Sequence, residues 1–251
     1  MMCLLQAVCA LVLCSACASV LQAAEVRVIS AGAMQPGLIA AAPAFRAVSG
    51  HEIKVEYAIA SELRRRIGGG EVAGVLFAPV AVIRELTDAG RLAAEGQVAV
   101  GRVGSGVVAR NGAPPFDISN AEALKRSLLA AERVVYNRAS SGVYIESMLK
   151  KLGVYDELGA RLVRYDDGTA VMHHLMQGSG REFGFGGITD ILLYRDKGLR
   201  LVGPLPEEIQ NYTAYAAARV ATTTQQDAAI AFLRYLASPD GKALFAANGI
   251  R

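Results

Sequence analysis

The feature that most constrains this fold is a strand that passes through small residues directly into a helix. Its first copy is residues 26–37, VRVISAGAMQPG, in which β-branched residues lead through Ala31, Gly32 and Ala33 to a helix that starts near Pro36. Proline suits the first helical turn because the N–H that it lacks has no intrahelical partner there. Such a helix start directs unpaired backbone N–H groups and the positive end of the helix dipole at one point, which favours a bound anion.

The same pattern recurs along the chain. A strand at residues 53–57 is followed by AIAS (58–61), a strand at 134–136 is followed shortly by ASSG (139–142), and 183–185 runs into two glycines. Strands that alternate with helices predict parallel sheets covered by helices on both faces. In such sheets, ligands bind beyond the carboxyl ends of the strands. The sequence therefore predicts an α/β fold with a binding cleft where these turns converge.

Two extended segments indicate that the chain crosses between two lobes. Residues 97–110 are extended and punctuated by glycine, and residues 212–218 read as a returning strand. We therefore expect lobe one to comprise residues 25–103 and 215–251, and lobe two to comprise residues 104–214. Pro43 lies inside the first expected helix and predicts a kink or a break there.

The first 24 residues are typical of a cleaved secretory signal peptide. They carry no charged residue, they end in small residues before Glu25, and they contain all four cysteines. The expected mature chain is periplasmic and has no disulfide, so it depends on a hydrophobic core. Two alternatives remain: an uncleaved membrane anchor, since about 18 apolar residues can span a bilayer, and acylation of Cys17.

Charge and motif content disfavour several classes of function. The 26 basic and 23 acidic residues are scattered, with no basic block that would favour nucleic acid. The phosphate-binding loop with its lysine and the Gly-x-Ser-x-Gly spacing of hydrolases are both absent. His173 and His174 are adjacent on an expected helix, so they cannot share a metal ion as a pair four residues apart could. We expect no metal, no cofactor and no nucleic acid, and we expect a monomer.

Several stretches resemble the ligand loops of periplasmic molybdate-binding proteins, which are solute receptors of ABC importers. These stretches are residues 28–34 (VISAGAM), 57–67 (YAIASELRRRI), 141–144 (SGVY), 183–190 (FGFGGITD) and 231–239 (AFLRYLASP). The resemblance covers nearly the whole mature chain. It implies the two-lobed clamshell of type II periplasmic binding proteins, with two crossover strands and closure by hinge motion. It also implies a small anionic ligand and, as partner, the membrane component of an importer.

The departures from that family predict a different ligand. Ala33, and Ile59 with Ala60, stand where the family places hydroxyl groups on the oxyanion, and Gly187 stands where it places a tyrosine. Burial of an oxyanion without its donors costs several kcal/mol. We therefore expect an organic carboxylate larger than molybdate, held by backbone N–H groups, a few hydroxyls and one arginine. The predicted ligand-binding residues are Ala33, Ile59, Ala60, Ser61, Ser141, Gly142, Thr169, Val171 and Gly187.

Aconitate isomerases, which are similar to this receptor family, supply an enzymatic alternative. Their reaction moves a double bond within a tricarboxylate by proton transfer and needs one base of suitable pKa, without a cofactor. The candidate bases are Glu62, His173, His174 and Asp190, and the sequence does not choose among them. Three of these candidates also have a structural interpretation: the two histidines as packing residues, and Asp190 as a carboxylate that suits a helix start.

Overall fold

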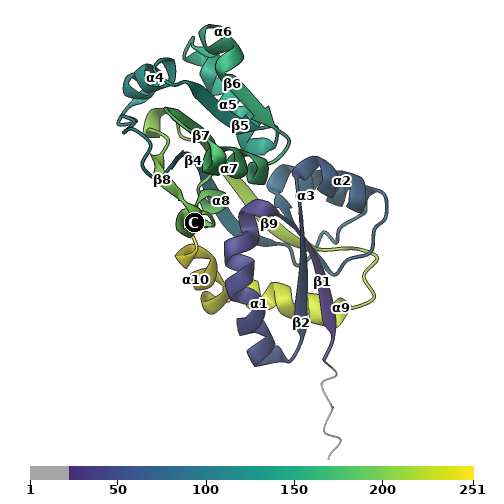
Figure 1. Ribbon diagram of the computed structural model, residues 1–251. Helices are drawn as coiled ribbons and strands as arrows, with labels where there is room; N and C mark the ends of the chain where they lie inside the picture. Colours follow the sequence, from purple (N-terminus) through teal and green to yellow (C-terminus); the bar gives the residue numbers. More distant parts are fainter. Residues whose placement is uncertain (1–22) are drawn as a thin grey trace, which may run out of the picture.

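The computed structural model describes residues 23–251, which form two halves joined through one nine-stranded mixed sheet (Figure 1). The strand order is β2-β1-β3-β9-β4-β7-β5-β6, and β8 pairs with β4. The strands are β1 (Glu25–Ala31), β2 (Glu52–Ala58), β3 (Val75–Pro79), β4 (Val98–Arg110), β5 (Arg133–Asn137), β6 (Leu162–Tyr165), β7 (Glu182–Gly187), β8 (Leu199–Pro204) and β9 (Tyr212–Arg219).

Helices cover both faces of each half (Figure 1). The α-helices are α1 (Gln35–Ser49), α2 (Ala60–Gly68), α3 (Val80–Asp88), α4 (Ala121–Leu129), α5 (Ser140–Lys151), α6 (Tyr155–Leu158), α7 (Gly168–Gln177), α8 (Ile188–Leu192), α9 (Gln226–Ala237) and α10 (Pro239–Ala247). The short 3-10 helices are η1 (Gly32–Met34), η2 (Gly159–Arg161), η3 (Arg195–Lys197) and η4 (Glu207–Ile209). None of the helices between residues 23 and 251 has the length and apolar character of a membrane span.

The long strand β4 belongs to both halves of the molecule. Its first part, residues 98–104, pairs antiparallel with β9, and its second part, residues 105–110, pairs antiparallel with β7 and β8. The strands β1, β2 and β3 are parallel in one half, and β5, β6 and β7 are parallel in the other. The predicted fold, two mostly parallel α/β lobes joined by crossing strands, is confirmed.

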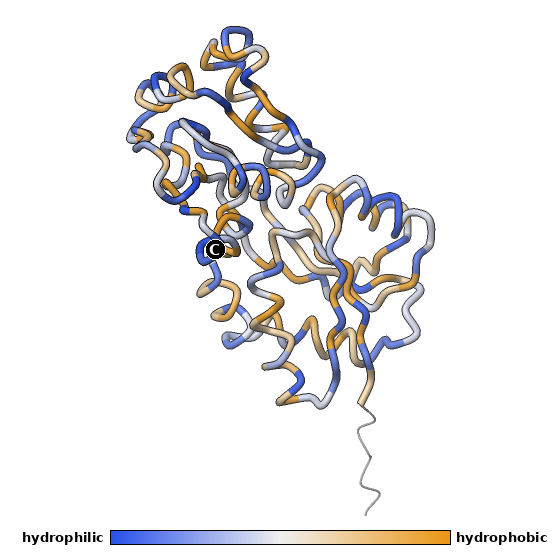
Figure 2. Tube along the Cα trace, viewed as in Figure 1, coloured by the Kyte–Doolittle hydropathy of each residue, from blue (hydrophilic) through white to orange (hydrophobic). Residues whose placement is uncertain are grey.

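The hydrophobic core is divided in the same way. One cluster draws on residues 26–103 and 215–250. Two further clusters draw on residues 107–205 and lie on opposite faces of the part of the sheet that contains β5, β6 and β7. Figure 2 shows hydrophobic segments in both halves. These separate cores support lobe boundaries near residues 103 and 215, which we propose as the limits of the two lobes.

The expected break at Pro43 does not occur, because α1 continues without interruption to Ser49. Pro43 lies on the exposed side of the helix, and burial of Leu38 and Phe45 on the opposite side offsets the hydrogen bond that proline cannot make. The predicted signal peptide, with Cys17, lies almost wholly outside the described residues.

Replacement of a central aromatic residue in lobe one tests this packing. Phe232 is fully buried, with its ring centroid 5.0 Å from that of Phe45 and 6.1 Å from that of Phe77. Phe232→Ala is expected to lower the free energy of unfolding by about 3–5 kcal/mol, because it removes contacts and leaves a cavity. Urea denaturation measures the change. Val48→Ala, at a side chain that is 73% exposed, is the control, and an equal loss in both variants would contradict this account of the core.

Candidate functional site

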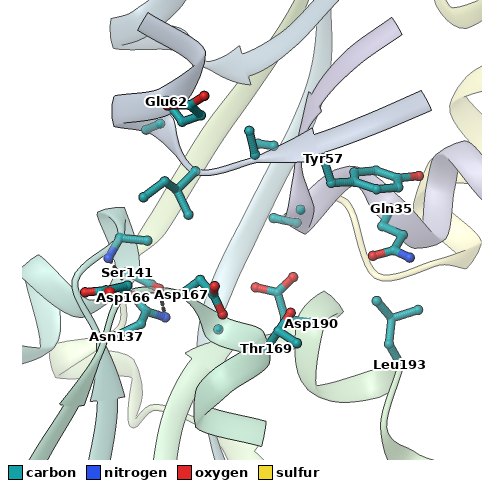
Figure 3. A pocket seen from close by; sticks show the side chains of 18 of the residues that line it. Gln35, Tyr57, Glu62, Asn137, Ser141, Asp166, Asp167, Thr169, Asp190 and Leu193 are labelled. Atoms are coloured by element: carbon teal, nitrogen blue, oxygen red, sulfur yellow. Dashed lines mark hydrogen bonds between the residues drawn. The ribbon is translucent and has the colours of Figure 1, made fainter. Parts of the chain in front are cut away.

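A cleft of about 800 Å³ lies between the two halves. Its lining comes from the ends of β1, β2 and β3 and the turns after them on one side, and from the end of β5, the turn after β6 and the helix α8 after β7 on the other (Figure 3). All six of these strands are parallel within their own half, so their carboxyl ends face a common space. This is the place where the alternation of strands and helices predicts a ligand.

Five of the nine predicted ligand-binding residues line this cleft. Ala33, Ile59 and Ala60 lie on the side of lobe one, and Ser141 and Thr169 lie on the side of lobe two. The structure therefore brings together residues that are as far as 136 positions apart in the chain (169 − 33). Their contact with a ligand stays a prediction.

The other four predicted residues do not line the cleft. Ser61 is exposed elsewhere on α2, and Val171 is fully buried in the core of lobe two. Gly142 is needed for close packing, since a Cβ atom there would overlap the carbonyl oxygen of Asn137. Gly187 is covered by the side chain of Asp190, whose Oδ2 atom would lie 3.1 Å from a Cβ atom at that position.

Three helix starts that line the cleft have no side-chain cap. Ala31, Ile59 and Ala139 precede η1, α2 and α5, and none of them accepts a hydrogen bond from the following turn through its side chain. By contrast, Asp167 caps α7 by accepting a hydrogen bond from the Ala170 N–H at 2.8 Å. The first N–H groups of an uncapped helix lack an intrahelical acceptor. The cleft can therefore offer backbone donors from both lobes to one anion.

Most charged side chains in the cleft are bound to other groups of the protein. These pairs are Glu62 with Arg65 (2.6 Å), Arg66 with Glu71 and Glu56 (2.6 and 2.7 Å), and Asp166 with Arg138 (2.6 Å). The hydrogen bond from Arg65 also lowers the pKa of the Glu62 carboxyl. Among residues 23–251, Asp190 and Lys197 are the charged groups of the cleft with no ion-pair or hydrogen-bond partner in the protein.

Asp190 projects into the middle of the cleft (Figure 3). Its carboxylate oxygens would lie 3.9 and 3.7 Å from Cβ atoms placed on Gly32 and Gly168, so it faces loops of both lobes. Asp190 is half-buried, and desolvation by the neighbouring protein atoms raises the pKa of its carboxyl to about 6. The phenol of Tyr215 is buried beside the cleft, and its pKa is raised by burial and by the charge of Asp190. An unpartnered carboxylate with a pKa near neutrality suits proton transfer.

The histidine candidates lie outside the cleft lining. His51 accepts a hydrogen bond from the Ala24 N–H (3.1 Å), and His174 shares a 2.9 Å hydrogen bond with the Tyr165 hydroxyl. His173 is exposed and packs edge-on to Tyr194, with ring centroids 6.1 Å apart. Of the four candidate bases, the structure thus brings Glu62 and Asp190 to the cleft. Within the described chain, no three His, Cys, Asp or Glu side chains gather as a metal site.

Several cleft residues were missed by sequence reasoning. They are Gln35, Tyr57, Asn137, Tyr194, Lys197 and Tyr215. Tyr57 and Asn137 lie at or next to the carboxyl ends of β2 and β5, so strand position could have indicated them. Lys197 and Tyr215 follow no such rule, because η3 and the crossing strand β9 reach the cleft only through tertiary structure.

The raised pKa of Asp190 predicts a pH-dependent penalty on stability. A carboxyl group whose pKa is about 6 in the folded protein, against an ordinary value of 3.8, stays neutral at low pH, so its burial costs little below pH 4. The penalty develops as pH rises to 6 and is complete above that, reaching at most about 3 kcal/mol. Asp190→Asn removes it. The stability gain of this variant over the wild type, from urea denaturation, should therefore be larger at pH 7 than at pH 4, and equal gains would contradict the burial argument.

Comparisons with known proteins place the chain in a family. It is 27% identical over 231 residues to the aconitate isomerase of a Pseudomonas species, covering 89% of this chain and 86% of that protein. The periplasmic molybdate-binding protein of Azotobacter vinelandii superposes with a TM-score of 0.75 at 18% identity, over 90% of this chain and 99% of that one. A sulfate-binding protein of Mycobacterium tuberculosis gives a TM-score of 0.71 at 20% identity, over 91% and 86%. The family model described as bacterial extracellular solute-binding protein matches residues 26–251, and the chain belongs to that family.

Proposed function

We propose that this protein is an exported receptor that captures a small organic carboxylate between its two lobes. The observation that carries the proposal is the convergence of uncapped helix starts from both lobes on one cleft. A carboxylate accepts several N–H hydrogen bonds at once, and bonds to a charged acceptor are stronger than neutral ones. Membership of the extracellular solute-binding family supports export to the periplasm and delivery to an ABC importer. We also propose a monomer.

Molybdate is a poorer ligand for this cleft. The side chains at Ala33, Ile59 and Ala60 line it but offer no hydroxyl group. The unpartnered carboxylate of Asp190 would face a tetrahedral dianion at close range, with repulsion that only protonation removes. A volume of about 800 Å³ also suits an organic molecule better than a single tetrahedral ion.

A charge placed at one helix start tests the carboxylate proposal. Ala60→Asp puts a carboxylate at the first residue of α2, where it suits the helix dipole but repels an anion in the cleft. Its affinity for carboxylates should fall at least about tenfold, while its thermal unfolding stays normal. Calorimetric titration with di- and tricarboxylates, molybdate, tungstate and sulfate measures this.

Gln226→Asp is the matched control, because it adds the same charge at the first residue of α9, outside the cleft. It should bind carboxylates as the wild type does. Submicromolar affinity of the wild type for molybdate, or equal losses in the two variants, would overturn the carboxylate proposal.

A second candidate function, isomerisation of a tricarboxylate, is favoured by Asp190. The similarity to an aconitate isomerase over most of both chains supports it. In this reaction the Asp190 carboxylate removes an allylic C–H proton, and the released electron pair forms the new double bond. The far carbon of the former double bond takes up a proton in exchange. The Asp190 carboxyl group can return the proton that it removed. The backbone N–H groups of the helix starts would stabilise the negative charge that spreads onto a substrate carboxylate.

Proton exchange with solvent distinguishes the enzyme from the receptor. The protein is incubated with trans-aconitate in deuterated water, and the proton spectrum of the substrate is followed. An isomerase incorporates deuterium and forms the cis isomer, and Asp190→Asn should abolish both. Glu62→Gln, at the other candidate carboxylate of the cleft, should retain activity because Glu62 is bound to Arg65. Stoichiometric binding with neither deuterium exchange nor formation of the cis isomer would remove the isomerase and leave the receptor.

A further inference from the structure

We propose that Lys197 binds a second carboxylate of the ligand, so that the cleft selects di- and tricarboxylates over monocarboxylates. The inference rests on the proposed capture of an organic carboxylate and adds the residue that decides its class.

Lys197 is the cation of the cleft that the protein leaves available. Lys197 and Arg66 are the lysine and arginine side chains among the described lining residues. Arg66 is bound to two glutamates, Glu56 and Glu71, whereas Lys197 has no carboxylate within ion-pair distance in residues 23–251. A cation that lines a cleft without a partner is positioned to bind an anion from solution.

The ammonium group of Lys197 is positioned by an aromatic ring. Its Nζ atom lies 4.7 Å from the centroid of the Tyr194 ring, a cation–π distance, and both residues line the cleft. The ring offers no acceptor oxygen toward the face that the ammonium occupies, so the hydrogen-bond donors of Lys197 remain open to a ligand. Tyr194 thus contacts the ammonium group without neutralising its charge.

The start of α5 and Lys197 belong to different elements of the cleft lining. In Figure 3, Asn137 and Ser141, near the start of α5, lie on one side of Asp190, and Leu193 and Tyr57 lie on the other. Lys197 follows Leu193 by four residues, on η3. The ligand that we propose contacts both the start of α5 and Lys197. A molecule with two carboxylates can do so, with its carbon chain passing Asp190.

The charge balance of the cleft points to the same ligand class. An anion near Asp190 meets a carboxylate that the protein does not pair. Lys197 is the free charge of opposite sign, so the second carboxylate that it binds offsets this repulsion. A small inorganic oxyanion has no second carboxylate to place at Lys197.

Binding of saturated acids to the full mature chain tests the role of Lys197 separately from turnover. The probes are propane-1,2,3-tricarboxylate, glutarate and butyrate, which carry three, two and one carboxylates and have no double bond to isomerise. Lys197→Met should weaken binding of the first two by about 10- to 100-fold, since it removes one charged hydrogen-bond donor. Its affinity for butyrate should not change, and Lys197→Arg should retain most of the preference. Lys242→Met, at an exposed lysine of α10 outside the cleft, is the matched control.

The outcomes separate the two proposals. If the wild type binds none of the three acids, the carboxylate receptor itself fails, and the role of Lys197 fails with it. If the wild type binds the tricarboxylate but Lys197→Met leaves its preference over butyrate unchanged, the role of Lys197 alone is wrong. A loss of preference in Lys197→Met, with normal thermal unfolding and a normal Lys242→Met control, supports it.

Discussion

The antiparallel pairing of β4 with β9 is the interaction on which the rest of the structure depends. Because β4 continues from this pairing into the sheet of the other half, the two sets of parallel strands point their carboxyl ends at one cleft. The end of the chain reinforces this region: Arg102 and Arg251 exchange two backbone hydrogen bonds, of 2.6 and 3.0 Å. Gly101 permits that contact, since it has a φ of +145° and a Cβ atom there would lie 3.1 Å from the Arg251 carbonyl oxygen.

The cleft combines two electrostatic tendencies that oppose each other. Uncapped helix starts attract an anion, whereas the Asp190 carboxylate repels one as soon as it ionises. An inorganic oxyanion that carries no proton has no hydrogen bond to donate to such a carboxylate. An organic acid can place its carboxylates at the helix starts and its carbon atoms beside Asp190, where a group of raised pKa can exchange protons with it. The same arrangement therefore suits a carboxylate receptor and an isomerase, and the chemistry at Asp190 separates them.

Three glycines of the neighbouring loops lie close to the Asp190 carboxylate. Cβ atoms on Gly32, Gly168 and Gly187 would all lie within 4 Å of its carboxylate. Gly187, predicted to bind the ligand, is instead covered by this side chain. A Cβ atom at Gly187 would press on this carboxylate, whereas Cβ atoms at Gly32 and Gly168 would lie at ordinary contact distance from it.

The sequence by itself determined the fold class, the crossing near residues 97–110 and the small-residue turns that begin the helices. These features follow from local periodicity and from the backbone N–H groups that every helix start leaves unpaired. Residues such as Ala33, Ala60 and Ser141 could be placed at the cleft on that basis. The tertiary structure alone decided which side chains face the cleft, because their direction depends on packing between distant elements. It turned Val171 into the core, covered Gly187 with Asp190, tied Glu62 to Arg65, and left Asp190 and Lys197 without partners. Burial, which raises the pKa of Asp190, is a property of the assembled lobes and has no signature in the local sequence.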